Sequence, residues 1–485
     1  MNQVIPETVS AMQEQMEITL ETVLSRLEND SEILGYTLGN DELLLWPFLR
    51  HSILIQLVYY NQGITWTPDA RPLSTGEKIR NLFHAIVHSP FRLIFERKKI
   101  LYFNSGTGNY LVDGVFHNRL VDDFYFTFPN DSALIESLRN GRVSFPRNHG
   151  NVYTHLGFKV ATKIMAPFYS SKNDRKTLES FYNFLRLRLN ELPVKASTWQ
   201  SISSMLQQDF TFLQVEYRIF SWFLKKVKPR LLIIEDAFHG YCAHLVKAAS
   251  HLDIPVAEFQ HGTINSKHLA YNYGHALNTS TEFALYNPGI FLSYGPFWTK
   301  GIRNPAINVS IGNPFISKQL IKNNDTVNKR VLILSAGVSE DKIHSLVKKL
   351  LDLNSLKDYT ISLRLHPLED NLAGKYDNLI SNRFQLDSES TIFESLGKSS
   401  IVFSEYSTAA FDALMFGKPV MLYKTEMVKM ATEAELELFR CFTLEELSDD
   451  FIINSMQSDD RNLNDVCDKN WEINFKNFIN KYLNS

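Results

Sequence analysis

Short apolar runs alternate with longer amphipathic segments along most of this chain. Three clear runs, residues 229–236, 254–259 and 401–404, are rich in Ile, Leu, Val and Phe and are followed by polar or turn-forming residues. Such runs are typical of buried parallel strands, and the helical periodicity between them is typical of crossover helices. The pattern therefore predicts an α/β protein built of parallel βαβ units.

The order of these segments divides the chain into four parts. Residues 1–97 show mostly helical periodicity and are predicted to form an N-terminal helical extension of the first domain. Residues 98–314 are predicted to form one Rossmann-like domain, residues 315–470 a second one, and residues 471–485 a last helix. A length of 485 residues is sufficient for two or three domains.

Several local expectations follow from the same periodicity. Helices are expected over residues 1–30, 42–60, 177–189 and 198–227, and a polar linker over residues 317–329.

Polar side chains follow two predicted strands of the second domain, at residues 359–365 and 401–404. Ligands of parallel sheets lie beyond the carboxyl ends of the strands. Ser407 and Thr408 are also expected at the start of a helix, where free backbone N–H groups and the helix dipole favour an anion. We therefore expect a phosphate site at this edge, formed by His366, Pro367, Ser404, Glu405, Ser407 and Thr408.

These motifs, His-Pro, S-E-Y-S-T and F-D-A-L-M-F-G-K-P-V in this order, resemble the donor-binding half of bacterial GT-B glycosyltransferases. The resemblance covers residues 231–423 and is greatest to two groups. One is the CMP-sugar transferases, which include sialyl-, polysialyl- and capsule Kdo transferases, and the other is the CDP-glycerol glycerophosphotransferases. It implies two Rossmann-like domains that face each other across a cleft, with a last helix that crosses back to the first domain. It also implies that the His-Pro pair and the Ser-rich helix start bind the phosphate of the donor.

A general base is expected at the carboxyl ends of strands in the first domain. Glu235 and Asp236 end one predicted strand, and Gly240 follows. This arrangement resembles the acidic pair and glycine of bacterial sialyltransferases, although there the glycine follows the pair directly and here three residues intervene. Capping of the helix expected from His239 onward is the alternative role of the two carboxylates.

His261 is the competing candidate for the base. The stretch Q-H-G-T-I-N-S-K-H that contains it resembles segments of CDP-glycerol transferases and capsule Kdo transferases. A neutral imidazole is suited to proton removal near pH 7, and a carboxylate that orients it is a common arrangement. Gly262 leaves room for a substrate, and Lys267 and His268 are expected either to contact acceptor or donor or to lie in a solvated loop.

Composition and motif content argue against several other functions. A net charge of −3 gives no general nucleic-acid signature. The three cysteines form no C-x-x-C motif, so neither a structural zinc site nor a disulfide framework is indicated. The sequence has no D-x-D motif at Asp122-Asp123 and no run of His, Asp and Glu at ligand spacing, so no metal and no cofactor are expected.

Together these features predict an inverting, metal-independent glycosyltransferase that moves an acidic sugar from a CMP-sugar to a surface polysaccharide or glycolipid. Three alternatives remain open: a CDP-polyol-dependent polyol-phosphate transferase, a sugar-nucleotide epimerase, and a non-catalytic polysaccharide-binding protein of the same fold. The expected partners are a nucleotide-sugar and an oligosaccharide or lipid-linked acceptor, without nucleic acid.

Residues 76–99 are both aromatic and basic, K-I-R-N-L-F-H-A-I-V-H-S-P-F-R-L-I-F-E-R-K-K from Lys78 onward. They fit either an interfacial membrane element or a buried helix with a charged, solvated end. The expected location is the cytoplasm, including the inner face of the cell membrane.

Overall fold

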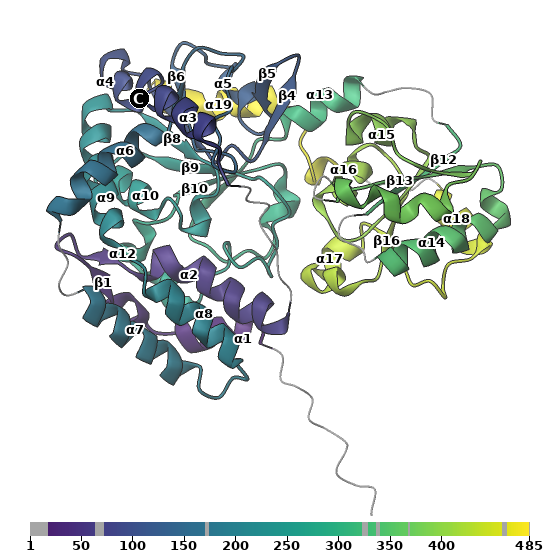
Figure 1. Cartoon of the computed structure of the whole chain (residues 1–485), viewed down its shortest axis with the longest axis horizontal. Helices are drawn as coiled ribbons and strands as arrows, with labels where there is room; N and C mark the ends of the chain where they lie inside the picture. Colours follow the sequence, from purple (N-terminus) through teal and green to yellow (C-terminus); the bar gives the residue numbers. More distant parts are fainter. Residues whose placement is uncertain are drawn as a thin grey trace, which may run out of the picture.

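The computed structural model describes residues 18–63, 72–169, 174–322, 328–335, 340–366, 369–457 and 463–484. Two parallel sheets, each with helices packed around it, form two Rossmann-like domains (Figure 1). The predicted fold class is therefore confirmed. In the described part of the chain, every neighbouring pair of strands in these two sheets is parallel.

The first sheet has seven strands in the order β11-β10-β9-β8-β3-β6-β7. Its strands are β3 (Ile100–Asn104), β6 (Ser132–Glu136), β7 (Val152–Thr154), β8 (Leu231–Ile234), β9 (Val256–Phe259), β10 (Ile290–Ser293) and β11 (Ile307–Ser310).

Both faces of the first sheet are covered. Leu101 and Phe103 of β3 pack with α6 (Leu156–Met165), α9 (Thr211–Val227) and α10 (Ala243–Ser250), whereas Ile100 and Tyr102 point to the opposite face. Because successive side chains of a strand alternate between faces, an apolar residue at every position requires cover on both sides.

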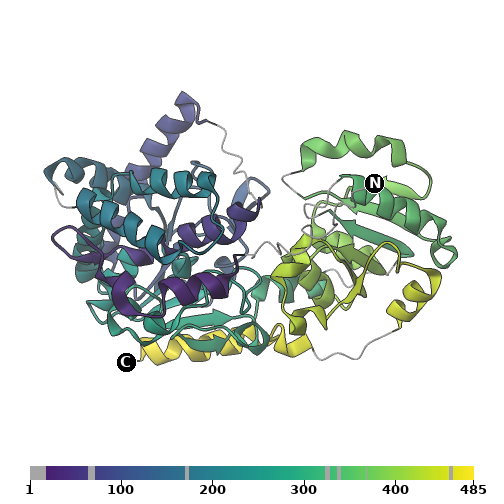
Figure 2. The same ribbon diagram turned by 90° about the horizontal axis from the view of Figure 1, so that it is seen from below.

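The last helix, α19 (Trp471–Leu483), provides that second cover. The Phe475 ring lies 4.5 Å from the Phe124 ring of α5 (Asp122–Tyr125), and Arg230 donates to the Leu483 carbonyl. In Figure 2 this yellow helix lies along the first domain, away from the rest of the C-terminal half. The chain thus returns to its first domain after completing the second.

The second sheet has six strands in the order β14-β13-β12-β15-β16-β17. Its strands are β12 (Arg330–Leu334), β13 (Thr360–Arg364), β14 (Phe384–Leu386), β15 (Ile401–Ser404), β16 (Val420–Tyr423) and β17 (Arg440–Phe442). Its helices are α13 (Pro314–Lys322), α14 (Glu340–Asp352), α15 (Ile392–Lys398), α16 (Thr408–Met415), α17 (Glu433–Leu436) and α18 (Asp449–Met456).

The N-terminal part forms a helical layer at one end of the first domain. It consists of α1 (Leu20–Leu27) and α2 (Trp46–Leu54), packed with α7 (Asp174–Arg188) and α8 (Ala196–Leu206) in one apolar core (Figure 1). A second group, α3 (Thr75–Val87) and α4 (Leu93–Glu96), precedes β3, and two small hairpins pair β1 (Thr37–Leu38) with β2 (Leu43–Leu44) and β4 (Asn109–Val112) with β5 (Val115–Asn118). Helices α11 (His275–Thr279) and α12 (Thr281–Ala284) complete the domain.

Several local predictions are wrong. The helix expected over residues 42–60 begins only at Trp46, because β2 occupies residues 43–44 and Pro47 lies in the first turn of α2. The helix expected over 198–227 is two helices, separated at residues 207–210. Residues 317–322 of the linker expected over 317–329 belong to α13, and residues 323–327 lie outside the described part. Of the helix expected over 1–30, residues 1–17 lie outside the described part, and α1 begins after a Thr19 cap.

Candidate active site

The carboxyl ends of β8 and β9 bring together Asp236 and His261, which are 25 positions apart in the sequence. Asp236 Oδ1 lies 3.0 Å from His261 Nε2, and the two side chains are 28% and 21% exposed. Adjacent parallel strands end at the same edge of a sheet, so this contact follows from the pairing of β8 with β9. The pair is a carboxylate and imidazole dyad that remains partly accessible.

The backbone around Asp236 turns sharply. Asp236 has φ 63° and Gly240 has φ 83°, so both lie in the left-handed region that favours glycine and, less strongly, Asp and Asn. A Cβ at Gly240 would lie 2.1 Å from the Pro47 carbonyl oxygen of α2. Gly240 therefore permits the close approach of the N-terminal helices. This gives it a packing role, separate from the acidic pair.

Two further carboxyls lie beside the dyad and are buried. Burial, followed by the negative charge of Asp236, raises the pKa of Glu235 to about 7. Its Oε2 accepts a hydrogen bond from the Ser105 N–H at 2.9 Å. Burial likewise raises the pKa of Glu258 to about 8, and its two oxygens accept from the Tyr271 hydroxyl and from the Phe238 N–H. Glu258 is thus favoured in its neutral form at pH 7.

These carboxyls control the charge of His261. Burial alone would lower its pKa, but Asp236, through its charge and its hydrogen bond, and to a lesser degree Glu258 and Glu235, raise it to about 9. For Asp236, burial opposes ionisation, and the adjacent His261 outweighs it and lowers the pKa of the carboxyl. At neutral pH the dyad is therefore an imidazolium beside a carboxylate. Asp236 is the group that can accept a proton.

Three other histidines surround the dyad: His51, which no sequence pattern indicated, His239, which was given no chemical role, and His268, which was expected either to contact acceptor or donor or to lie in a solvated loop. The His239 ring lies 4.3 Å from that of His51, 5.3 Å from that of His261 and 5.7 Å from that of His268. Burial lowers the pKa of His51 to about 4 and that of His268 to about 3, so both are neutral near pH 7. Nothing in the local sequence indicates His51, because it comes from α2, more than 180 positions before the dyad.

The sequence showed no group of metal-ligating residues at ligand spacing, but the fold brings one such group together. The expectation that no metal is required stays a prediction. Asp236, His239 and His261 each offer one ligand atom, and these atoms all lie within 4.8 Å of one another. The cluster forms only in the fold because η6 (Ala237–His239) and the loop after β9 converge. Asp236 and His261, two of its three residues, already pair directly with each other.

A buried ion pair from the N-terminal helices supports the loop after His268. Arg50 Nε lies 2.7 Å from Glu28 Oε1, and both side chains are almost completely buried. Arg50 also donates to the carbonyls of Leu269 and Asn272, and Glu28 accepts from the Gly274 N–H. The helical extension therefore fixes the backbone of a loop that begins at the dyad.

The loop between His261 and His268 contacts the second domain. Asn265 Nδ2 donates to the Tyr406 hydroxyl at 3.1 Å and to Glu435 Oε2 at 2.7 Å. Lys267 Nζ donates to the carbonyls of Lys429 and Ala431. Lys267 was expected in contact with substrate or in a solvated loop. It is exposed, and its side chain also joins the two domains. The loops at the carboxyl ends of the two sheets thus meet at this point.

The other two residues of that loop have different surroundings. His268 is half-buried, its Nδ1 accepts from the Ala270 N–H, and its ring packs against Tyr271. Gly262 has open space on the side where a Cβ would lie, as its predicted role requires.

In the second domain, the predicted phosphate residues lie at the ends of β13 and β15. His366 is exposed, and its N–H donates to Ser335 Oγ at 2.8 Å. Ser407 is the N-cap of α16 and makes no side-chain capping bond, and Thr408 is the first helical residue. The Ser404 and Ser407 hydroxyls lie 3.3 Å apart, and Glu405 is buried with its pKa raised by that burial. Pro367 lies outside the described residues.

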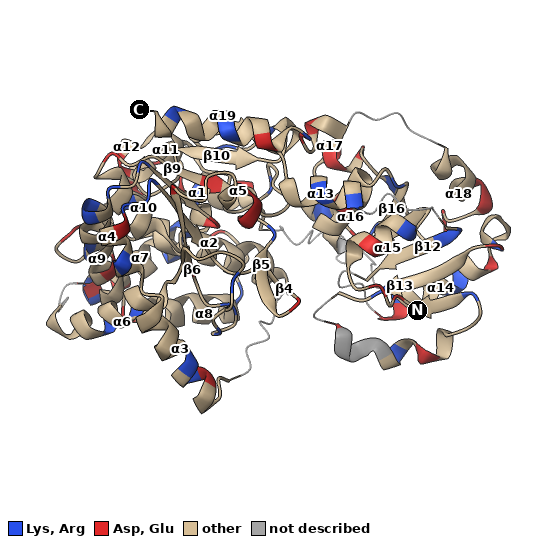
Figure 3. Ribbon diagram, turned by 90° about the horizontal axis from the view of Figure 1, so that it is seen from above, with Lys and Arg blue, Asp and Glu red and all other residues tan. Residues whose placement is uncertain are grey.

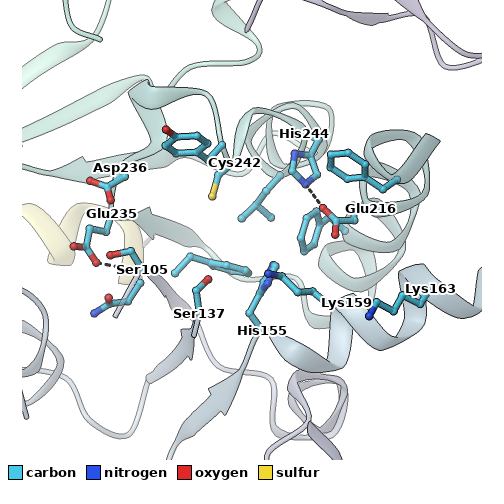
Figure 4. Close-up of a pocket in the computed structure, with 16 residues that line it drawn as sticks. Ser105, Ser137, His155, Lys159, Lys163, Glu216, Glu235, Asp236, Cys242 and His244 are labelled. Carbon is cyan, nitrogen blue, oxygen red and sulfur yellow. Dashed lines mark hydrogen bonds and ion pairs between the residues drawn. The ribbon is translucent and has the colours of Figure 1, made fainter. Parts of the chain in front are cut away.

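A cavity of about 500 Å³ opens beside the dyad in the first domain. Figure 4 shows Glu235 and Asp236 at one end of it and Lys159 and Lys163 of α6 toward the other. Aromatic side chains, among them Phe212 and Phe220, line its walls. The mixture of apolar walls and a few polar groups is typical of small-molecule sites.

Comparison with known proteins identifies no family. No family model matches the chain, and no curated protein matches it. Similar solved structures include UDP-GlcNAc 2-epimerase from Methanocaldococcus jannaschii, with a TM-score of 0.44, 10% identity, and coverage of 79% of this chain and 99% of that one. UDP-GlcNAc 2-epimerase from Neisseria meningitidis bound to UDP-GlcNAc has a TM-score of 0.42 and 12% identity, with coverage of 80% of this chain and 99% of that one. Acinetobacter baumannii MurG has a TM-score of 0.38 and 9% identity, with coverage of 80% of this chain and 100% of that one. Similarity at this level assigns no function, so the functional argument rests on the site.

Proposed function

We propose that this protein is an inverting, metal-independent glycosyltransferase that uses a nucleotide-sugar donor, with Asp236 as its general base. The observation that carries the proposal is the dyad of Asp236 and His261, 3.0 Å apart, partly exposed and beside the cavity at the carboxyl edge of the first sheet. A base at such an edge, opposite a phosphate site in another domain, meets the geometric needs of sugar transfer.

The reaction requires one proton transfer on the acceptor side. Asp236 takes the proton of an acceptor hydroxyl as the oxygen attacks the anomeric carbon, and the bond from that carbon to the donor phosphate breaks with its electron pair on the nucleotide. His261, held as an imidazolium, orients the carboxylate and opposes its protonation in the resting state. This assigns His261 to positioning instead of the base role that the sequence left open.

The donor side of the proposal uses the second domain. The free N–H groups of α16 and the hydroxyl of Ser407 donate hydrogen bonds to the leaving phosphate and stabilise its negative charge. His366, which follows β13 at the same edge of the sheet, adds a charge-assisted hydrogen bond to the phosphate. The proposed donor is a CMP-linked acidic sugar, on the strength of the His-Pro and S-E-Y-S-T motifs.

The experiment incubates the full chain with CMP-, CDP-, UDP- and GDP-activated sugars and candidate saccharide acceptors, and measures nucleotide release together with glycosylated product. Asp236→Asn is expected to lower kcat by ~10²–10⁴ while donor affinity stays unchanged. Asp113→Asn is the matched control, because Asp113 is an exposed aspartate in the left-handed region where Asn is tolerated. Near-normal turnover of Asp236→Asn with a working acceptor would reject Asp236 as the base.

The same assay separates the other candidate reactions. An acceptor product that carries a polyol phosphate would identify a CDP-polyol-dependent transferase. Isomerised sugar without any acceptor would identify an epimerase, and the absence of turnover with every donor despite nucleotide binding would identify a non-catalytic protein.

A further inference from the structure

The helix α3 has its apolar face toward solvent. Ile79, Leu82, Phe83 and Ile86 follow the i, i+3, i+4, i+7 spacing of a single helix face and are 65%, 56%, 59% and 70% exposed. The opposite face packs on the domain through small or polar side chains, and the Asn81 amide donates to the Gly141 carbonyl. In a helix that only covers a core, the apolar stripe faces inward. The outward stripe of α3 is therefore available to contact a partner outside this domain.

The neighbouring helix extends this apolar surface. Helix α6, which packs against α3, exposes Val160 and Ile164, and the turn after it exposes Phe168 by 84%. We call these residues and the α3 stripe the apolar ridge. In Figure 2 the α3 helix, in dark blue, stands out from the body of the first domain. Exposed apolar groups that are contiguous and project in this way mark an interaction surface.

The charges beside the ridge are positive. Lys78 and Arg80 on α3 and Lys159 and Lys163 on α6 are exposed, and none of them has a carboxylate within ion-pair distance in the described part of the chain. The single acidic residue of α3, Glu77, is paired with Arg142, and α6 contains no acidic residue. Figure 3 shows the blue and red segments of α3 at its projecting end.

We propose that the apolar ridge is a docking surface for an anionic lipid bilayer. Apolar side chains on a projecting helix, with unpaired Lys and Arg beside them, match the apolar interior and the negative headgroups of such a surface. None of the described helices could cross a bilayer.

The position of the ridge also bears on the acceptor. Lys159 and Lys163 belong both to the border of the ridge and to the lining of the cavity beside Asp236. If the ridge rests on a bilayer, the far end of that cavity lies next to the lipid surface, which favours an acceptor carried by the membrane. This extension to the acceptor rests on the proposed function, whereas docking itself does not.

The test measures co-sedimentation of the full chain with phosphatidylcholine vesicles, with and without phosphatidylglycerol. We expect binding only to the anionic vesicles, weakened by salt because exposed charges are screened. The double variant Leu82→Gln, Phe83→Gln and the double variant Lys78→Gln, Arg80→Gln should each lower the affinity by about tenfold or more. Ile473→Gln is the control, because Ile473 on α19 is 62% exposed but lies on another helix.

Three outcomes would overturn the proposal: no binding to anionic vesicles, unchanged binding by both double variants, or a dimer in solution that Leu82→Gln, Phe83→Gln dissociates. The last would show that the ridge binds a second copy of the chain. Because vesicle binding needs neither donor nor acceptor, its failure leaves transfer to a soluble acceptor intact. Failure of sugar transfer likewise leaves vesicle binding intact.

Discussion

At the scale of single residues, the ionisation states in the site depend on several titratable groups that lie close together. One imidazole lies among three carboxyls, and the outcome is one ionised acid, Asp236, and two acids, Glu235 and Glu258, whose pKa values are raised. Carboxyls in one cluster with diverging pKa values are a common arrangement for assigning acid and base roles. The surrounding neutral histidines add hydrogen-bonding groups without adding charge.

His366→Ala is expected to weaken CMP binding by roughly ten- to a hundredfold, because a charge-assisted bond contributes ~1.5–3 kcal/mol. Ser407→Ala should cost less, since a neutral hydroxyl bond contributes ~0.5–1.5 kcal/mol and the N–H groups of α16 remain. Isothermal calorimetry of both variants checks the order. A greater loss for Ser407→Ala would place the phosphate closer to the helix than to the imidazole.

Glu258→Gln is expected to stabilise the protein at alkaline pH. The folded-state pKa of Glu258 is raised from 4.5 to about 8, so its stabilising contribution is complete below about pH 4.5 and is lost as the pH rises through 8. Glutamine imitates the neutral acid and should therefore remove this loss of stability. Each unit by which folding shifts the pKa corresponds to about 1.4 kcal/mol of that loss. Thermal unfolding of both proteins from pH 5 to pH 9 should show a difference in Tm that grows with pH. A constant difference would mean that Glu258 does not titrate in this range.

At the scale of elements, the loop after β9 connects three parts of the molecule. It starts at the dyad, reaches the second domain through Asn265 and Lys267, and then rests on the N-terminal helices through Arg50. A helical layer that is remote in sequence therefore contributes to the shape of the site. These contacts are the physical reason that the N-terminal helices pack as part of the first domain.

Glu28→Gln is expected to lower the free energy of unfolding by about 3–5 kcal/mol, because it leaves the buried Arg50 without its anionic partner. Urea denaturation measures the change. Glu21→Gln on the same helix is the matched control, since the pair of Glu21 with Arg303 is exposed and should contribute less than about 1 kcal/mol. Equal effects of the two substitutions would show that burial of the Glu28 pair is not what stabilises the loop.

At the scale of the whole molecule, each sheet presents its carboxyl edge to the loops that join the domains, and α19 returns to cover the first sheet. The arrangement separates two tasks. In the proposed function, the second domain supplies groups for the phosphate, and the first supplies the base and the cavity.

Turnover is expected to be unchanged after dialysis against EDTA, because the charge of the leaving phosphate is met by the start of α16 and by His366. Activity with and without added Mg²⁺, Mn²⁺ or Zn²⁺ provides the measurement. Loss of activity in EDTA that one of these ions restores would mean that Asp236, His239 and His261 hold a metal, since their ligand atoms are close enough.

The amino-acid sequence alone was sufficient for the fold class and most strands, because an apolar run followed by a polar turn is a local property. It also placed Asp236, His261, His366 and Ser407 at the ends of strands, and adjacency of parallel strands then made the contact of Asp236 with His261 foreseeable. The split of α8 from α9 and the hairpin before α2 were missed, since tertiary packing overrode the helical periodicity there.

The chemistry of the site, in contrast, depends on contacts that no local pattern carries. Glu258 and His51 enter it from a buried strand and from a helix far away in sequence, and neither has a local signal. Glu258, together with Asp236 and Glu235, raises the pKa of His261. In the proposed function that shift gives the base role to Asp236. The outward apolar face of α3 is likewise invisible in its periodicity, because a helical pattern shows that one face is apolar but not which face the rest of the chain will cover.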